Sequence, residues 1–222
     1  MKISYNHIRS LLKDSPTISD VSERLFQLGH ENSGEKDIFD IEFTPNRGDC
    51  LSLLGITRDL NVFYKTKLDF DIYKKNIQTL DLDFNNYSDD KCPKISFLNI
   101  KVKNKKSKYK NYLERYFKDL GNNKVNFFTD ISNYLAYELG QPTHAYDFTK
   151  IKNNQISLCK NKSNETFKTI TGSKIKVDPN DLVFTNNNKI INLSGIMGGE
   201  DTACDQNTNN ALIECAFFEP EA

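Results

Sequence analysis

Residues 109–121 read YKNYLERYFKDLG and form the most clearly periodic segment of this 222-residue chain. The large apolar and aromatic side chains recur every three or four positions, at Tyr109, Tyr112, Leu113, Tyr116, Phe117 and Leu120. That spacing places them on one stripe of an amphipathic helix, and Gly121 is a typical residue at which such a helix ends. We therefore predict a helix here whose stripe packs into a core.

The residues before this helix predict a small α+β unit over residues 1–68. Helical apolar spacing occurs at residues 4–12, 18–28 and 53–63, and a strand-like alternation at 37–43. Ser4 and Asp49 are the residues we expect to cap the first and last of these helices.

A polar stretch, residues 69–93, is predicted to be a surface connection to a second domain at 94–222. In this domain we expect a strand at 95–102 and a second helix that Asp130 caps and Pro142 ends. Short β-like runs follow at residues 156–159, 166–170, 182–185, 189–192 and 211–215. The predicted fold class is α+β, with a small helical and strand N-terminal unit followed by a mixed α/β domain.

The composition excludes several classes of protein. The chain has 37% hydrophobic residues, a mean hydropathy of -0.61, and 30 basic against 30 acidic residues, so no global charge favours DNA or an anionic membrane. No apolar run is long enough to span a bilayer, and the first residues lack the layout of a signal peptide, so we expect a cytoplasmic protein.

The cysteines and histidines predict neither a disulfide framework nor a metal site. The five cysteines, at positions 50, 92, 159, 204 and 215, are odd in number and form no CxxC pair. The histidines, at positions 7, 30 and 144, lack the spacing of a local metal pair. We expect reduced thiols and no bound metal.

Four short segments are more specific than their surroundings. They are residues 42–52 (EFTPNRGDCLS), 139–147 (LGQPTHAYD), 194–200 (SGIMGGE) and 212–218 (LIECAFF). In this order and at this spacing they resemble the N-terminal part of the bacterial phenylalanyl-tRNA synthetase beta subunit, including its editing domain. The resemblance covers essentially the whole chain.

The chain departs from the family pattern in three respects. Gly29 and Asp37 are separated by seven residues, where most bacterial members insert an OB-fold tRNA-binding module. The family chain continues far beyond the equivalent of Phe218, and its next segment lines part of the editing pocket, so the resemblance implies a fragment with a truncated domain. Asn123 stands where the bacterial family often has Arg, which a neighbouring Lys does not replace.

The resemblance implies a hydrolytic function. A synthetic pocket sized for phenylalanine is poor at rejecting tyrosine, because an apolar pocket does not strongly exclude an isostere that adds a hydroxyl. A second site that hydrogen-bonds this hydroxyl accepts tyrosine and leaves phenylalanine with unpaired polar groups. In the family, the editing domain hydrolyses mis-charged Tyr-tRNA(Phe), and we expect the same of residues 94–222.

The resemblance assigns the substrate-binding residues one by one. Glu214 matches the glutamate that recognises the phenol, and a carboxylate is a strong acceptor for a phenolic hydroxyl. Read alone, it is a surface carboxylate on a strand, but its apolar neighbours favour an inward position. Gly198 and Gly199 match a glycine pair that lets a ligand approach the backbone, and read alone they are a turn.

The remaining predicted site residues surround the ester. His144, in the loop that we expect after Pro142, matches the family histidine near the ester, and orienting the substrate is favoured over general-base catalysis. Ser132 and Asn133 match a Thr-Asn pair of the pocket, with helix caps near Asp130 as the alternative. Pro142 is also assigned to substrate binding.

Partners and cofactors follow from the resemblance. They are tRNA(Phe) and the alpha subunit, with which the beta subunit forms a heterotetramer that ligates phenylalanine to tRNA using ATP and Mg²⁺ outside this chain. Two other functions stay open: a scaffold module with a degenerate pocket, and a freestanding hydrolase that edits in trans. Arg47 and Asp49 are expected to be structural, as an ion-pair partner and a helix cap.

Overall fold

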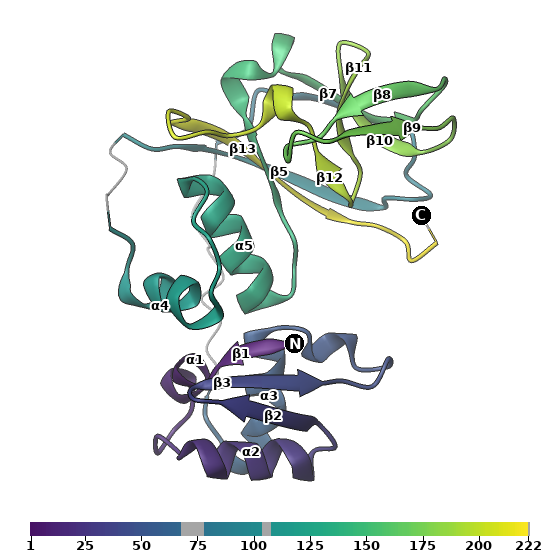
Figure 1. The fold of residues 1–222 in the computed structure, drawn as a ribbon. Helices are drawn as coiled ribbons and strands as arrows, with labels where there is room; N and C mark the ends of the chain where they lie inside the picture. Colours follow the sequence, from purple (N-terminus) through teal and green to yellow (C-terminus); the bar gives the residue numbers. More distant parts are fainter. Residues whose placement is uncertain (68–77, 104–107, 222) are drawn as a thin grey trace. The chain divides into compact units, whose positions relative to one another are not determined.

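The computed structural model describes residues 1–67, 78–103 and 108–221, which form two compact units. Residues 1–76, 106–124 and 133–142 belong to the first unit, and 77–105, 125–132 and 143–222 to the second. The fold is α+β, as predicted (Figure 1). Among the described residues, no helix combines the length and the apolar character needed to span a bilayer.

The first unit contains a three-stranded antiparallel sheet in the order β1-β3-β2, together with helices α1 to α4. Its elements are β1 (Lys2–Ser4), α1 (Tyr5–Leu11), α2 (Ile18–Gln27), β2 (Glu31–Glu35), β3 (Ile38–Glu42), the 3-10 turn η1 (Gly48–Cys50), α3 (Leu53–Tyr64) and α4 (Asn111–Leu120). The predicted helices and the strand at 37–43 are present, whereas β1 and β2 had not been expected. Both are short, and β2 is a polar segment that became a strand by pairing with β3.

Of the two helix caps predicted for this unit, Ser4 holds the expected N-cap position and Asp49 does not. Ser4 precedes α1, but its hydroxyl donates to Asp119 of α4 at 2.6 Å and makes no capping bond. Helix α3 is capped by Ser52, whose Oγ accepts from the backbone N–H of Gly55 at 2.9 Å. Asp49 instead lies in η1, where its carboxylate pairs with Arg47.

Helix α4 buries the centre of its apolar stripe, Leu113, Tyr116 and Phe117, within the first unit, while Tyr112 is exposed. Its C-cap is Gly121 at φ +67°, as the sequence predicts. The His7 ring lies between two of the unit's tyrosines: Nε2 is 2.9 Å from the carbonyl oxygen of Tyr112, and Nδ1 is 3.0 Å from the hydroxyl of Tyr137. This packing groups α4 with the N-terminal residues, whereas the sequence placed it after the boundary at 94.

Helix α5 (Phe127–Leu139) begins four residues earlier than a helix capped by Asp130 would. Asn126 accepts from the N–H of Thr129, and Asp130 lies inside the first turn, where its carboxylate accepts from the N–H of Val125 at 2.8 Å. Asp130 is therefore not the N-cap, and Ser132 and Asn133 are interior helical residues rather than caps.

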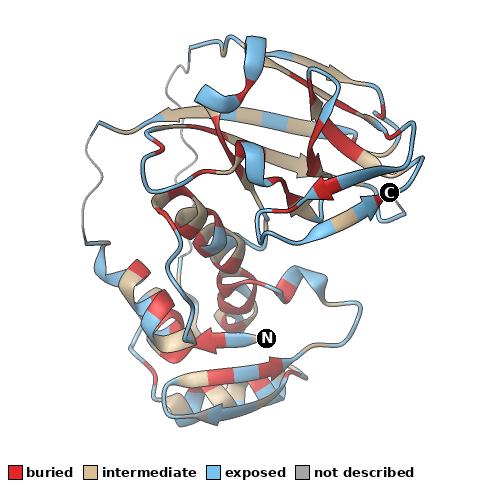
Figure 2. Ribbon diagram, turned by 45° about the horizontal axis from the view of Figure 1, so that its top comes forward, coloured by how far each residue is buried: buried red, intermediate tan, exposed pale blue. Residues whose placement is uncertain are grey.

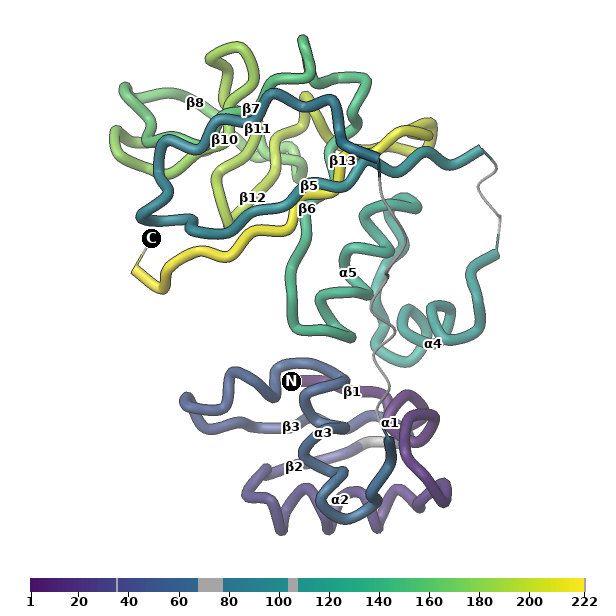
Figure 3. Tube along the Cα trace, turned by 180° about the vertical axis from the view of Figure 1, so that it is seen from behind, coloured from purple at the N-terminus to yellow at the C-terminus, as the bar shows by residue number. Residues whose placement is uncertain are grey.

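The second unit contains a five-stranded sheet in the order β12-β11-β10-β7-β4, a three-stranded sheet in the order β5-β13-β6, and a two-stranded ribbon of β8 and β9. The strands are β4 (Asp83–Asn86), β5 (Lys94–Lys101), β6 (His144–Asp147), β7 (Gln155–Lys160), β8 (Glu165–Lys168), β9 (Lys174–Val177), β10 (Leu182–Asn186), β11 (Lys189–Leu193), β12 (Met197–Gly198) and β13 (Asn210–Phe217). Short 3-10 turns are η2 (Phe148–Lys150), η3 (Lys152–Asn154) and η4 (Glu200–Thr202). Figure 3 shows β5 running beside β13, in agreement with their antiparallel pairing.

All five predicted short strands of this unit are present, and four others were missed. The predicted connection at 69–93 contains one of them: β4 pairs in parallel with β7, and Ser88 and Cys92 beyond it are buried. Residues 68–77 of that connection lie outside the described residues. The remaining unpredicted strands are β6, β9 and β12.

The hydrophobic core of the second unit is formed mainly by side chains from its strands. Buried residues concentrate along the strands and exposed residues in the loops (Figure 2). One cluster joins the five-stranded and three-stranded sheets and consists of Cys92, Tyr146, Ile151, Ile156, Leu158, Phe184, Ile191 and Leu212. The predicted site residues of this unit lie at the edge of this cluster.

Candidate functional site

The three-stranded sheet brings His144 and Glu214 together. Glu214, in the long central strand β13, pairs with His144 of β6 on one side and with Phe97 of β5 on the other. Directly opposed residues in a sheet point to the same face, so the imidazole and the carboxyl group share one face. The sequence placed His144 in a loop, but it begins a strand.

Glu214 is a buried carboxyl group, with 5% of its surface exposed. Its Oε2 accepts a hydrogen bond of 2.7 Å from the hydroxyl of Tyr146. Burial raises the pKa of Glu214 to about 7, and the bond from Tyr146 opposes this rise. The inward position favoured by its apolar neighbours is therefore the one observed.

The His144 ring packs edge-on against Tyr146, with ring centroids 4.4 Å apart. Its Nε2 is buried and has no hydrogen-bond partner among the described residues. Burial lowers the pKa of His144 to about 4, so the ring is neutral at physiological pH. A neutral ring with one buried free nitrogen is available to a ligand as a hydrogen-bond donor or acceptor, depending on its tautomer.

Gly198 and Gly199 have close neighbours where a side chain would begin. A Cβ on Gly198 would lie 2.1 Å from Cε1 of His144, and one on Gly199 would lie 2.8 Å from the carbonyl oxygen of Ile191. Neither glycine has a positive φ, so space and not backbone conformation explains the missing side chains. Gly198 thus lies against the histidine and Gly199 against Ile191 and Phe167, so the approach of a ligand to this pair, which the resemblance implied, stays a prediction.

Of the helical residues predicted for the site, Ser132 has an observed link to it. Its Oγ accepts a bond of 3.0 Å from the hydroxyl of Thr143, which directly precedes His144. Asn133 and Pro142 are exposed and belong to the first unit, so their assignment to the site stays a prediction.

Two further polar side chains belong to this site and were missed by the sequence analysis. Tyr146 is fully buried, and its hydroxyl accepts a bond of 2.8 Å from the amide of Asn192 in β11. A signal for Tyr146 was present, because it follows His144 by two positions and would share its face in a strand. Asn192 lies in the five-stranded sheet, and no feature of the sequence pointed to it as a site residue.

A cavity of about 510 Å³ lies beside the segment of Ser194, Gly195 and Ile196. Its other lining residues include Leu182 and Phe218, but neither His144 nor Glu214. The half-buried histidine with its buried Nε2 and the buried carboxyl group mark the candidate site more strongly than this cavity does, because perturbed titratable groups are typical of functional sites.

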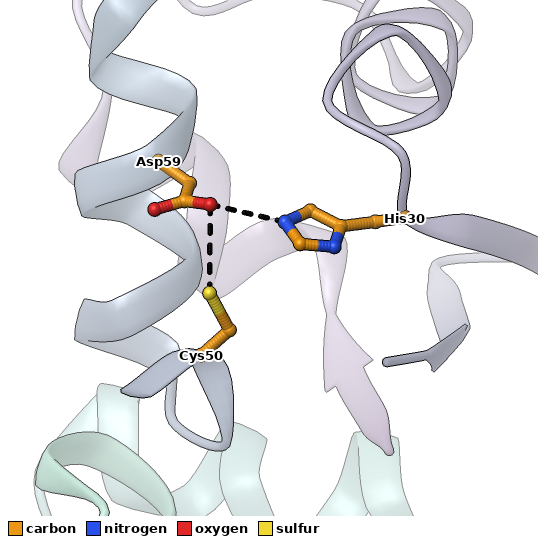
Figure 4. Close-up of side chains that lie close together, drawn as sticks. All are labelled: His30, Cys50 and Asp59. Atoms are coloured by element: carbon orange, nitrogen blue, oxygen red, sulfur yellow. Dashed lines mark hydrogen bonds and ion pairs between the residues drawn. The ribbon is translucent and has the colours of Figure 1, made fainter. Parts of the chain in front are cut away.

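A second polar cluster lies in the first unit. His30, Cys50 and Asp59 place their ligand atoms within 4.8 Å of one another. Figure 4 shows that Asp59 is central, with contacts to His30 Nε2 at 3.1 Å and Cys50 Sγ at 3.5 Å. The guanidinium of Arg47 donates to Asp59 at 2.6 Å and to Cys50 at 2.8 Å.

The donors of this cluster fit an ion-pair network better than a metal. Burial raises the pKa of Cys50 to about 12, so the sulfur is a protonated thiol. Burial would also raise the pKa of Asp59, but bonds from His30, Arg47 and Cys50 outweigh it and lower that pKa. Because Arg47 already supplies the positive charge, we assign it the structural ion pair that the sequence predicted.

Comparison with known proteins places this geometry in a family. A family model described as "B3/4 domain" matches residues 91–222, which include every residue of the site in the second unit. The chain belongs to the B3/4 domain family. The B3/4 domain therefore supplies His144, Tyr146, Asn192 and Glu214.

Two relatives that match most or all of the chain are beta subunits of the same enzyme. The beta subunit of phenylalanine–tRNA ligase from Fusobacterium nucleatum is 32% identical over 187 residues, which are 83% of this chain and 23% of that protein. The beta subunit from Burkholderia lata is 30% identical in an alignment of 226 positions, gaps included, which covers 100% of this chain and 27% of that protein. The chain thus spans about a quarter of the length of these relatives.

A solved structure shares the fold. It is a crystal structure of an N-terminal fragment of the phenylalanyl-tRNA synthetase beta subunit from Pyrococcus horikoshii, with a TM-score of 0.52 and 13% identity. The match covers 100% of this chain and 69% of that fragment. At this identity the likeness supports the α+β architecture that the sequence predicted.

Proposed function

We propose that residues 94–222 form a tRNA-editing domain that hydrolyses the ester of tyrosine mis-charged on tRNA(Phe). The observation that carries this proposal is the buried carboxyl group of Glu214, which already accepts a phenolic hydroxyl, that of Tyr146, at 2.7 Å. The carboxyl group of Glu214 is thus buried and oriented in a way that lets it accept a phenolic hydroxyl. The relatives named above are beta subunits of phenylalanine–tRNA ligase, and such an enzyme must distinguish phenylalanine from tyrosine.

Selectivity follows from the cost of an unpaired buried group. A tyrosyl ester donates its phenol to Glu214, whereas a phenylalanyl ester brings an apolar ring edge to the same oxygen. A lost bond to a charged, buried partner costs roughly 1.5 to 3 kcal/mol. With a pKa of about 7, Glu214 is largely ionised, and hence the stronger acceptor, above neutral pH.

The chemistry is an attack of water on the ester carbonyl. The bond between the carbonyl carbon and the ribose oxygen breaks, the water's oxygen joins the carbonyl carbon, and its proton passes to the ribose oxygen. His144 is neutral and has a buried free Nε2, so we assign it to orienting the ester or the water through a hydrogen bond. Because Gly198 has no side chain, the His144 ring fits against it. The hydroxyl of Thr143, the residue before His144, donates to Ser132 and so helps to hold the backbone at His144.

The wider assignments rest on the relatives. We place Asn133 and Pro142 on the substrate, and we propose tRNA(Phe) and the alpha subunit of the synthetase as partners in the cytoplasm. ATP and Mg²⁺ serve aminoacylation in the complete synthetase, and we assign no residue of this chain to them.

A scaffold role is the second candidate. One observation favours it: the carboxyl group of Glu214 already has a protein partner, Tyr146, and therefore does not require a ligand. A scaffold would keep the buried Glu214 without using it on a substrate.

Deacylation of Tyr-tRNA(Phe) by this chain tests the proposal, with Phe-tRNA(Phe) as the competing substrate. We expect faster release of tyrosine, and a loss of that preference by about 10- to 100-fold in Glu214→Ala. Glu200→Ala is the matched control, because Glu200 is an exposed carboxylate beside Gly199 that pairs with Lys168. Equal release of both amino acids by the folded wild-type chain would favour the scaffold.

A further inference from the structure

Three buried polar groups form a linear hydrogen-bonded relay in the second unit. The amide of Asn192 donates to the hydroxyl of Tyr146 at 2.8 Å, and that hydroxyl donates to Oε2 of Glu214 at 2.7 Å. The exposed fractions are 4%, 0% and 5% in the same order. The relay crosses from the five-stranded sheet, which holds Asn192, to the three-stranded sheet, which holds the other two.

The backbone and the ring of Tyr146 are both held in place by their neighbours. Its backbone pairs with Leu212 of β13 and forms an isolated bridge with Ala203. Its ring is part of the core cluster that includes Phe184, and the His144 ring packs against it. A rotation that withdrew the hydroxyl from Glu214 would open a void in this core, which is costly.

A carboxylate can accept hydrogen bonds at both of its oxygens. Oε2 is held by Tyr146, and no hydrogen bond to Oε1 occurs among the described residues, so Oε1 is the oxygen left for a ligand. We propose that Tyr146 and Asn192 are positioning residues that orient Glu214 so that Oε1 receives the phenol of the substrate. This inference rests on the proposed editing function and adds to it two residues that act through Glu214.

The relay also bears on the charge of Glu214. The titratable groups near the carboxyl group are His144 in β6, Cys92 before β5 and, on the opposite face of β13 itself, the adjacent Cys215. Burial lowers the pKa of His144 and raises the pKa of both thiols, so all three are neutral near pH 7. The bond that stabilises the anion of Glu214 therefore comes from Tyr146.

Tyr146→Phe tests the inference, because it removes one hydroxyl and keeps the buried ring. The first readout is the carboxyl ¹³C NMR titration of Glu214 in the whole chain. We expect the pKa of Glu214 to rise by roughly one to two units. The second readout is the pH profile of the preference for Tyr-tRNA(Phe) over Phe-tRNA(Phe), whose midpoint should move upward by the same amount.

Tyr134→Phe is the matched control. Tyr134 is also a buried tyrosine that donates to a glutamate, Glu138, at 3.0 Å, but it belongs to the first unit. We expect it to leave both midpoints unchanged. Asn192→Ala is a second test of the relay, with a smaller upward shift, and it decides the question if Tyr146→Phe does not fold.

An unchanged Glu214 midpoint in folded Tyr146→Phe, or a stronger preference for tyrosine at pH 7, would overturn the inference. The latter result would mean that Tyr146 competes with the substrate. If the proposed editing function were wrong, the wild-type chain would show no preference for Tyr-tRNA(Phe) in the deacylation assay. The NMR titration would still report whether Tyr146 stabilises the ionised form of Glu214.

Discussion

Burial perturbs the two titratable residues at the centre of the site in opposite directions. The pKa of Glu214 rises from 4.5 to about 7, and that of His144 falls from 6.5 to about 4. Between these values both groups are largely neutral, and above pH 7 the site acquires one negative charge on Glu214. A site built in this way accepts a phenol best on the alkaline side of neutrality.

Glu214→Gln should change how stability depends on pH. Since the folded-state pKa is raised, the stabilising protonation of Glu214 is complete below pH 4.5 and is lost as pH rises through about 7. This loss amounts to about 3 kcal/mol in the wild type and is absent from the variant. The free energy of unfolding of the variant minus that of the wild type should therefore rise by about this amount between these pH values, as measured by urea denaturation.

Glu200→Gln provides the control for that series, because Glu200 is exposed and pairs with Lys168 at the surface. Its difference from wild type should change far less over the same range, because an exposed ion pair contributes little to stability. An equally small change for Glu214→Gln would mean that the Glu214 pKa is not raised by folding.

Gly198→Ala should disturb the histidine more than the fold. The added Cβ would lie 2.1 Å from Cε1 and 2.7 Å from Nε2 of His144, so the ring must move. A displacement of about 1 Å at a reacting centre costs roughly 100-fold in rate, and overpacking costs about 1 to 3 kcal/mol of stability. Deacylation kinetics and thermal unfolding measure the two effects.

Gly48→Ala is the comparison for this substitution, since nothing lies within 4 Å of a Cβ at that position. It should leave the deacylation rate unchanged. If Gly198→Ala retained the wild-type rate, the close approach of His144 to the glycine would have no role in the reaction.

Strands and helices differ in how far the sequence predicted them. The long periodic helices, such as α3 and α4, were predicted from their own residues. Strand β6 was not, because it has four residues and exists by pairing with β13, which lies more than sixty residues along the chain. This missed strand is the element that places His144 and Tyr146 on one face with Glu214.

Ser52→Ala should destabilise the first unit by about 1 kcal/mol, because Ser52 and not Asp49 caps α3. The lost bond is the one from the N–H of Gly55 to Ser52 Oγ, which is buried. Chemical denaturation gives the magnitude. Ser163→Ala, at a serine whose hydroxyl binds the exposed carboxylate of Glu165, should change stability by less than half as much. Equal effects would argue against the cap.

At the scale of the whole molecule, the sequence predicted two domains but not how the chain is shared between them. Residues 108–124 and 133–142 return to the N-terminal unit because the tyrosines of these segments pack around His7. Aromatic periodicity shows that a helix buries a stripe, but it does not show against which partner. The motif resemblance, in contrast, assigned Glu214, His144 and Gly198 to one site, and the structure places these three residues close together.

The central claim is that Glu214 recognises the phenol of a tyrosyl ester. The most direct measurement is a calorimetric binding cycle with two non-hydrolysable ligands, a tyrosyl and a phenylalanyl amide of 3′-amino-3′-deoxyadenosine, against the wild-type chain and Glu214→Ala. The account predicts that the wild type prefers the tyrosyl ligand by roughly 1 to 3 kcal/mol and that Glu214→Ala loses this preference. The same preference in both proteins would contradict it.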